Sequence, residues 1–330
     1  MFFVEREIFH PLEKKPYVLD GRKTVEELDA SFSRLKTKYD WKKVYLYTQT
    51  SPSVNTAFDI FLYLSPSCGE AIWYFGGIHG EESAPPNAYA ENVDLLGNLG
   101  KNIPIVLAPV LNKLGYCINQ RYPNTSEDKG SSISDADFLL PGSIDPQKTR
   151  IPFPPSYQTF ILFRKIINLL PHYPPLLVYD GHEDFVEESE PPIMVDEHLN
   201  PHCYIYSQGR LGPNDPIATK IVRIFEKHGF TLIKEGRTRF PHEIVKNGIV
   251  SRNDGQIIED GSLEEFFACD TYFYNNSRVK KVPAPHIITG ETTINGYPLP
   301  RRIAAHSEVI QCTDRFWKIA NQRKNETLYP

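Results

Sequence analysis

The stretch AIWYFGGIHGEESAPPNAYA (71–90) places an imidazole and carboxylates directly after an apolar run. His79 and Glu82 form an H-x-x-E pair. On a turn that enters a helix, positions three apart face the same way. One imidazole nitrogen and one carboxylate oxygen at this spacing can bind the same zinc ion. H-x-x-E also occurs by chance in solvated loops, so the interpretation needs a third ligand.

His182 is the third candidate, in the segment VYDGHED (178–184). A catalytic zinc ion commonly has three protein ligands and keeps one position for water. Polar groups of α/β proteins collect at the carboxyl ends of strands. Both His79 and His182 follow apolar, strand-like runs, and this shared placement strengthens the case for a zinc site, with two unrelated loop histidines as the open alternative.

The elements that would position these residues alternate between strand and helix patterns. The order strand, helix, strand around residues 71–112 is typical of a largely parallel sheet. We expect one α/β domain with helices covering the sheet. The predicted strands are 43–50, 58–65, 71–75, 103–112, 176–185 and 286–294, and the predicted helices are 24–39, 87–99, 157–171, 217–230 and 307–324.

Composition excludes several classes of protein. The chain has 330 residues with 41 acidic and 36 basic side chains mixed along it, a net charge of -5, so no basic footprint for nucleic acid is present. No apolar run reaches the length of about 18 residues that crosses a bilayer. The start MFFVEREIFHPLEKK lacks a secretory pattern, and the five cysteines have no CxxC pair. We expect a cytoplasmic protein that binds neither nucleic acid nor membrane; the oligomeric state is left open.

Several short motifs, in the right order, resemble those of the M14 zinc metallocarboxypeptidase family. GGIHGEES resembles the zinc-ligand loop of the family, APVLNKLGY its strand followed by N-P-D-G-[FY], and VYDGHED the strand that ends in the third ligand. NQRY resembles the Arg-Tyr element of the related aspartoacylase and succinylglutamate desuccinylase branch. HIITGETTINGYPLPRRI resembles the late strand that carries the catalytic glutamate.

This resemblance implies a fold and a reaction. The fold is a mixed, largely parallel twisted sheet with helices on both faces. Residues 1–330 would be a single zinc-hydrolase domain, with an N-terminal extension and helix over 1–40 and a catalytic core over 41–330. His79, Glu82 and His182 would bind one Zn²⁺, which lowers the pKa of its water to about 7. Glu291 would be the general base, and Arg121 would stabilise the oxyanion.

The segment DADFLLPG (135–142) stands where the family usually has D-L-N-R-N-F-P. Asp135 keeps the place of the aspartate that hydrogen-bonds a ligand histidine and fixes its tautomer. Asp137 and Phe138 replace the Asn-Arg pair that binds the free carboxylate of a C-terminal substrate. Since Phe cannot form a bidentate pair and Asp repels a carboxylate, ordinary carboxypeptidase recognition is not expected. Other arginines that could replace this clamp are Arg237, Arg239, Arg252 and Arg278.

Four residues are predicted to contact substrate: Asn112, Asp137, Tyr272 and Tyr274. Asn112 follows the predicted strand of APVLNKLGY, and Asp137 could bind an amine. The family has a substrate-capping tyrosine about 20 residues before its catalytic glutamate, a spacing that Tyr272 and Tyr274 share. With 18 tyrosines in the chain, a packing role is the alternative for either one.

The sequence therefore predicts a zinc-dependent hydrolase that cleaves an amide bond in a peptide or an acylated amino acid. An N-acyl amino acid deacylase of the aspartoacylase type is the nearest alternative, favoured by NQRY, whereas the turn GYPLP favours a peptidase. An inactive, metal-free binding protein on the same scaffold is the alternative from another class. A serine hydrolase is disfavoured, because no G-x-S-x-G elbow occurs.

Overall fold

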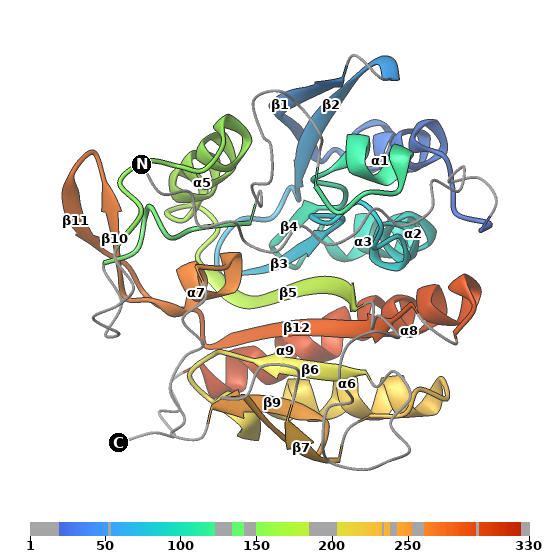
Figure 1. Ribbon diagram of the computed structural model, residues 1–330, viewed down its shortest axis with the longest axis vertical. Coiled ribbons are helices and arrows are strands. Elements are labelled where there is room, and N and C mark those ends of the chain that lie inside the picture. The colour runs from blue at the N-terminus through green and yellow to red at the C-terminus, as the bar shows by residue number, and fades with distance from the viewer. Residues whose placement is uncertain are drawn as a thin grey trace.

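The protein is built around a ten-stranded mixed sheet (Figure 1). The computed structural model describes residues 20–51, 54–122, 134–141, 150–184, 203–232, 234–237, 243–252, 261–294 and 297–324. The strand order is β1-β2-β4-β3-β5-β12-β6-β9-β8-β7. The strands are β1 (Lys42–Ser51), β2 (Val54–Leu64), β3 (Ala71–Gly76), β4 (Ile105–Ala108), β5 (Pro175–Asp184), β6 (Tyr204–Ser207), β7 (Glu235–Arg237), β8 (Glu243–Lys246), β9 (Ile249–Arg252) and β12 (His286–Thr293).

The centre of the sheet is parallel. Strands β4, β3, β5 and β12 pair in parallel, and antiparallel β2 and β6 flank them. Central strands buried on both faces read as near-continuous apolar runs, as β3 (AIWYFG) does. Because parallel strands end at the same edge, the carboxyl ends of β3 and β5 lie side by side.

Helices cover both faces of the sheet, and each face has its own apolar core. Residues alternate between the faces: Ile72 and Tyr74 of β3 join one core, while Trp73 and Phe75 join the other. The helices of the first core are α1 (Val25–Tyr39), α2 (Ala84–Glu91), α3 (Val93–Leu99), α4 (Lys113–Ile118), α6 (Pro216–Lys227), α8 (Leu299–Gln311) and α9 (Thr313–Arg323). Those of the second are α5 (Tyr157–Leu169) and α7 (Leu263–Ala268). The predicted fold class is confirmed.

Two predicted helices are each broken into a pair. The segment predicted as 87–99 forms α2 and α3, which meet at Asn92. The side-chain amide of Asn92 donates to the carbonyl of Ala88 at 2.8 Å, and such a bond competes with a regular helical backbone. The closing helix begins earlier than predicted, at Leu299, and breaks at Cys312. Within the described residues, no helix is both long and apolar enough to cross a membrane.

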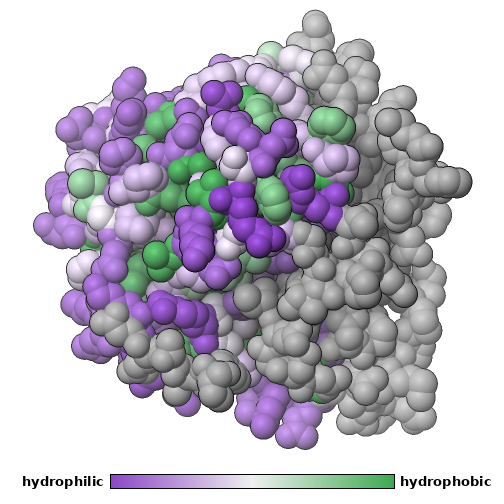
Figure 2. Space-filling model, turned by 90° about the vertical axis from the view of Figure 1, so that its left-hand side faces the viewer, coloured by the Kyte–Doolittle hydropathy of each residue, from purple (hydrophilic) through white to green (hydrophobic). Residues whose placement is uncertain are grey.

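A small two-stranded sheet, β10 (Thr271–Tyr274) and β11 (Ser277–Lys280), projects beside α5 (Figure 1). The side of the molecule that carries these elements faces the viewer in Figure 2, where apolar side chains show between hydrophilic ones. Phe153, Tyr157 and Val282 are large and exposed. In the coloured part of this view the apolar areas are small and interrupted, as is usual on protein surfaces.

A substitution of Phe163 on α5 tests the packing of the second core. Its fully buried ring contacts Phe138 and Phe266, with ring centroids 6.0 and 5.3 Å away. Phe163→Ala should lower the free energy of unfolding by about 3–5 kcal/mol, because truncation leaves a cavity. Tyr157→Ala on the same helix, where the side chain is exposed, should change it by less than about 0.5 kcal/mol. Urea unfolding followed by circular dichroism measures both. Equal midpoints for the two variants would contradict the packing described here.

Candidate metal centre

The first two candidate ligands lie on the loop that connects β3 to α2. The chain leaves β3 through Gly77, whose φ of 59° lies in the left-handed region that favours glycine. The carbonyl of Gly77 accepts the backbone N–H of Asn112 at 2.7 Å. The N–H of Gly80 donates to the carbonyl of Arg121 at 3.2 Å, so the loop is anchored on both sides of His79.

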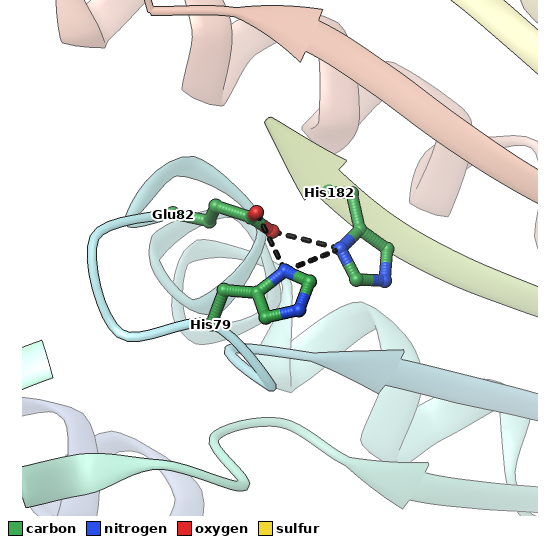
Figure 3. Close-up of side chains that lie close together, drawn as sticks. All are labelled: His79, Glu82 and His182. Atoms are coloured by element: carbon green, nitrogen blue, oxygen red, sulfur yellow. Dashed lines mark hydrogen bonds and ion pairs between the residues drawn. The ribbon is translucent and has the colours of Figure 1, made fainter. Parts of the chain in front are cut away.

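The third candidate, His182, lies near the end of the neighbouring strand β5 and meets the other two (Figure 3). Nδ1 of His79 is 2.7 Å from Glu82 Oε1, and Nδ1 of His182 is 2.8 Å from Glu82 Oε2. The two Nδ1 atoms are 3.2 Å apart. All three side chains are buried, and each offers a ligand atom within 4.8 Å of the others.

Buried charges set the protonation of this group when no cation is bound. Burial lowers the pKa of His79 to about 3, and the nearby Arg121 acts in the same direction. Burial alone would lower the pKa of His182, but the carboxylates of Asp180 and Glu82 outweigh it and raise that pKa well above its usual value. Burial would raise the pKa of Glu82, but His79 and His182 together hold it well below the usual range. The group thus carries a carboxylate and imidazole nitrogens turned toward one point.

Asp180 is a candidate site residue to which the sequence reasoning assigned no role. Its Oδ2 lies 3.2 Å from Nε2 of His182, the ring nitrogen that faces away from Glu82. A carboxylate on the second nitrogen of a ligand histidine fixes its tautomer and raises its basicity. Residues two apart on a strand share a face, and this was the signal available in D-x-H. Glu264 of α7 lies beside Asp180 and His182 and accepts the hydroxyl of Thr289 at 2.8 Å.

Arg121 lies against the group. Its Nη1 donates to Glu82 Oε1 at 3.0 Å and to Glu81 Oε1 at 3.1 Å. Burial raises the pKa of Glu81 to about 7, despite the guanidinium. The structure therefore places a positive charge beside the candidate ligands, where the resemblance implied an oxyanion partner. That role stays a prediction.

Glu291 lies on β12, directly across from His182 of β5 in the parallel register. Residues in register on neighbouring strands point to the same face, so the Glu291 carboxylate is on the side of the sheet that carries His182. Burial raises the pKa of Glu291 well above its usual value, and the carboxylates of Glu82 and Asp184 add to this effect. The role of Glu291 as a proton acceptor stays a prediction.

Asn112 makes structural contacts around α4 and Arg121. The residue is fully buried and caps α4, with Oδ1 accepting from the N–H of Gly115 at 2.8 Å and from Gln49 Nε2 at 3.2 Å. Its Nδ2 donates to the carbonyl of Arg121 at 3.0 Å. These contacts are structural, because Asn112 holds the backbone that carries Arg121, and the predicted substrate contact stays a prediction.

The segment around Asp135 contributes packing. Asp135 Oδ1 accepts the N–H of Asp137 at 3.1 Å, and the Asp137 carboxylate lies against Gly261. Phe138 is buried, with its ring 6.0 Å from that of Phe163. Phe138 is thus a core side chain. The carboxylate that the structure places on a ligand histidine is Asp180, and the roles predicted for Asp135 and Asp137 stay predictions.

The two candidate tyrosines lie on β10. Tyr272 is buried against Phe266, at 5.6 Å between ring centroids, and Tyr274 is partly buried against the same core. These are packing contacts, as the alternative interpretation expected, and a capping role for either stays a prediction. Of the arginines considered as a replacement clamp, Arg278 stacks on Phe273 of the same hairpin at 5.7 Å, and Arg239 lies outside the described residues.

The donor set fits a divalent cation such as zinc. Two imidazole nitrogens and a carboxylate are ligand types that zinc binds, and three protein ligands leave a position for water. Their nearest atoms are close enough for one ion to bind all three after small adjustments. The partner on His182 Nε2 completes the arrangement that a metal-binding histidine usually has.

Comparison with known structures agrees with this geometry. No protein-family model matches the chain, and no curated protein matches it in sequence. The solved structure of a "putative metallopeptidase" from Shewanella amazonensis SB2B is similar with a TM-score of 0.63 and 16% identity, over 88% of this chain and 92% of that one. The corresponding protein of Shewanella baltica OS155 gives 0.61 and 16%, over 87% and 88%. A metallo-carboxypeptidase from Burkholderia cenocepacia gives 0.52 and 12%, over 89% and 70%.

The chain has the metallo-carboxypeptidase fold. At these identities the likeness extends to the fold alone, and the role of each site residue must be argued from its own surroundings. For the candidate ligands, the contacts among His79, Glu82 and His182 are the basis of that argument.

Asp180 provides a test of the centre. Asp180→Asn should weaken zinc affinity by about 10–100-fold, because the amide no longer orients and polarises His182. The matched control is Asp184→Asn, four residues further along the same face of β5, which removes an equal charge without changing the contact to His182 Nε2. Competition with a chromophoric chelator measures both affinities. The interpretation is wrong if the two variants lose affinity equally.

Proposed function

We propose that the protein is a zinc-dependent hydrolase of an amide bond in a peptide or an acylated amino acid. The observation that carries the proposal is the convergence of His79, Glu82 and His182, buried and within 4.8 Å of one another, beside Arg121 and Glu291. The metallo-carboxypeptidase fold supports it. The carboxyl edge of a parallel sheet is where such folds collect their chemical groups.

The proposed ion and the side chains have different roles in the reaction. A divalent cation supplies Lewis-acid chemistry, because it polarises a carbonyl oxygen and lowers the pKa of water. Glu291 accepts a proton from the attacking water and delivers it to the leaving nitrogen as the carbon–nitrogen bond breaks.

Arg121 stabilises the charge that develops on the carbonyl oxygen. Its guanidinium is held in place by Glu81, and its backbone carbonyl by Asn112 and Gly80. A donor fixed before the reaction needs no reorganisation when the oxyanion forms, which is the main source of its effect. The buried surroundings strengthen the interaction further.

Recognition of a free C-terminal carboxylate is not part of the proposal. Phe138 occupies the core, and the Asp137 carboxylate lies against Gly261. A panel of peptides, blocked peptides and N-acyl amino acids, tested with the zinc-loaded protein, distinguishes peptidase from deacylase. Absence of bound metal and of turnover on the whole panel would favour the metal-free binding protein instead.

Glu291→Gln is the direct test of the general base. The amide has nearly the same size but accepts no proton, so kcat should fall by a factor of about 10²–10⁴. The zinc content should remain that of the wild type, because Glu291 is not among the three candidate ligands. Turnover is followed by ninhydrin detection of released amine, and zinc by atomic absorption. Unchanged kcat would remove Glu291 from the mechanism.

Arg121→Met should move two measurements in opposite directions. We expect kcat to fall by about 10²–10³, as for loss of an oxyanion donor. Zinc affinity should stay the same or rise, because the Arg121 guanidinium binds Glu82 Oε1 and competes with a cation for that oxygen. Steady-state kinetics and chelator competition provide the two readouts. A variant that loses zinc affinity would show that Arg121 is needed to build the centre.

A further inference from the structure

The two residues that flank His182 on β5 contact the first residues of α2, which directly follows the loop that carries the other ligands. Glu183 Oε2 accepts the backbone N–H of Ala84 at 2.8 Å, two residues after Glu82. Gly181 lies against Pro85, so closely that a Cβ atom added to it would come within 2.7 Å of the proline ring. Both contacts are on the face of the sheet opposite His182, since side chains alternate along a strand.

Glu183 is held firmly in this position. It is buried, and Nη1 of Arg302 from α8 pairs with its Oε1. The hydroxyl of Thr292 donates to the same oxygen at 3.3 Å and lies 3.1 Å from Nε2 of His306. A buried carboxylate satisfied on both oxygens has one orientation, so Glu183 is a rigid acceptor for the Ala84 N–H.

Helix α2 has no cap of its own. The preceding residue, Ser83, makes no side-chain hydrogen bond to the first turn, and no acidic residue lies in that turn. The first N–H groups of a helix need acceptors, and a negative charge at this end is stabilising. Glu183 supplies both from a strand about 100 residues away in sequence, so the start of α2 is fixed relative to β5.

We propose that Glu183 and Gly181 are positioning residues that set the distance between the ligand loop and His182. The proposal rests on the metal centre proposed above. His182 turns toward the ligands on one face, while its two neighbours attach Ala84 and Pro85 on the other. Any displacement of α2 along β5 would therefore separate Glu82 from His182.

The main test is zinc affinity of Glu183→Ala, measured by chelator competition on the folded, full-length chain. The affinity should fall by about 10–100-fold, as for other residues that orient metal ligands. Hydrogen exchange of the metal-free variant should also be faster in residues 78–91 than in the wild type. Glu183→Gln keeps an oxygen acceptor for Ala84 and should recover part of the affinity.

Asp215 provides the matched control. It is likewise a buried carboxylate that accepts a helix N–H, from Ile217 at 2.8 Å, and pairs with a buried base, His286, at 2.7 Å. His286 is five residues before Glu291 on β12, about 16 Å along the strand. Asp215→Ala should lower stability similarly but change zinc affinity by less than about threefold. Equal loss of affinity in both variants would overturn the proposal, because it would then reflect general destabilisation.

Gly181→Ala tests the same attachment without removing a charge, and it serves if Glu183→Ala does not fold. The added methyl group should push Pro85 away and lower zinc affinity. Gly97→Ala, where a Cβ atom would lie 2.3 Å from the ring of Tyr39, is its control far from the centre. Wild-type affinity in Gly181→Ala and in the Glu183 variants would contradict the inference alone. Absence of zinc binding in the wild type would contradict the proposed function itself.

Discussion

The parallel pairing of β3 with β5 is the constraint on which the rest of the site depends. Phe75 pairs with Asp180 and Gly76 with Gly181, so the last residue of β3 lies beside the residue that precedes His182. His79 and Glu82 lie just beyond the first strand, and His182 lies at the end of the second. Residues about 100 positions apart in sequence thereby meet with hydrogen-bonding distances between them. A shift of this register by one residue would turn His182 to the opposite face.

The site also contains several buried carboxylates whose charges must be paired. Carboxylates of Glu81, Glu82 and Asp180 are buried together, and a buried charge is costly unless it is paired. Arg121 and His182 provide the pairing in the metal-free arrangement. A divalent cation would also neutralise part of this buried negative charge. The same side chains can therefore be buried without a cation and can also bind one. Glu183 lies just behind this group and is neutralised separately by Arg302.

Sequence patterns predicted the fold class, and the three candidate ligands that they indicated lie close together in the structure. Apolar runs ending in glycine and polar residues identified β3, β5 and β12, because buried parallel strands need such runs. Features that depend on tertiary packing were less accessible. The segment DADF (135–138) does not indicate that Phe138 packs on Phe163. Similarly, the identity of Asn112 does not indicate that its buried side chain caps α4. Asp180 could have been found from strand alternation, whereas Glu264 approaches it from a helix whose position the sequence does not indicate.

The most direct test of the account is the zinc stoichiometry of the wild type and of His182→Ala, each equilibrated with buffered zinc at nanomolar free concentration. His228→Ala is the control, since that histidine pairs with Glu308 in the α6–α8 region. We predict about one zinc ion per chain in the wild type and in the control, and close to none in His182→Ala, because a site with only three protein ligands loses most of its affinity when one of them is removed. Equal zinc content in all three proteins, or none in the wild type, would contradict the central claim.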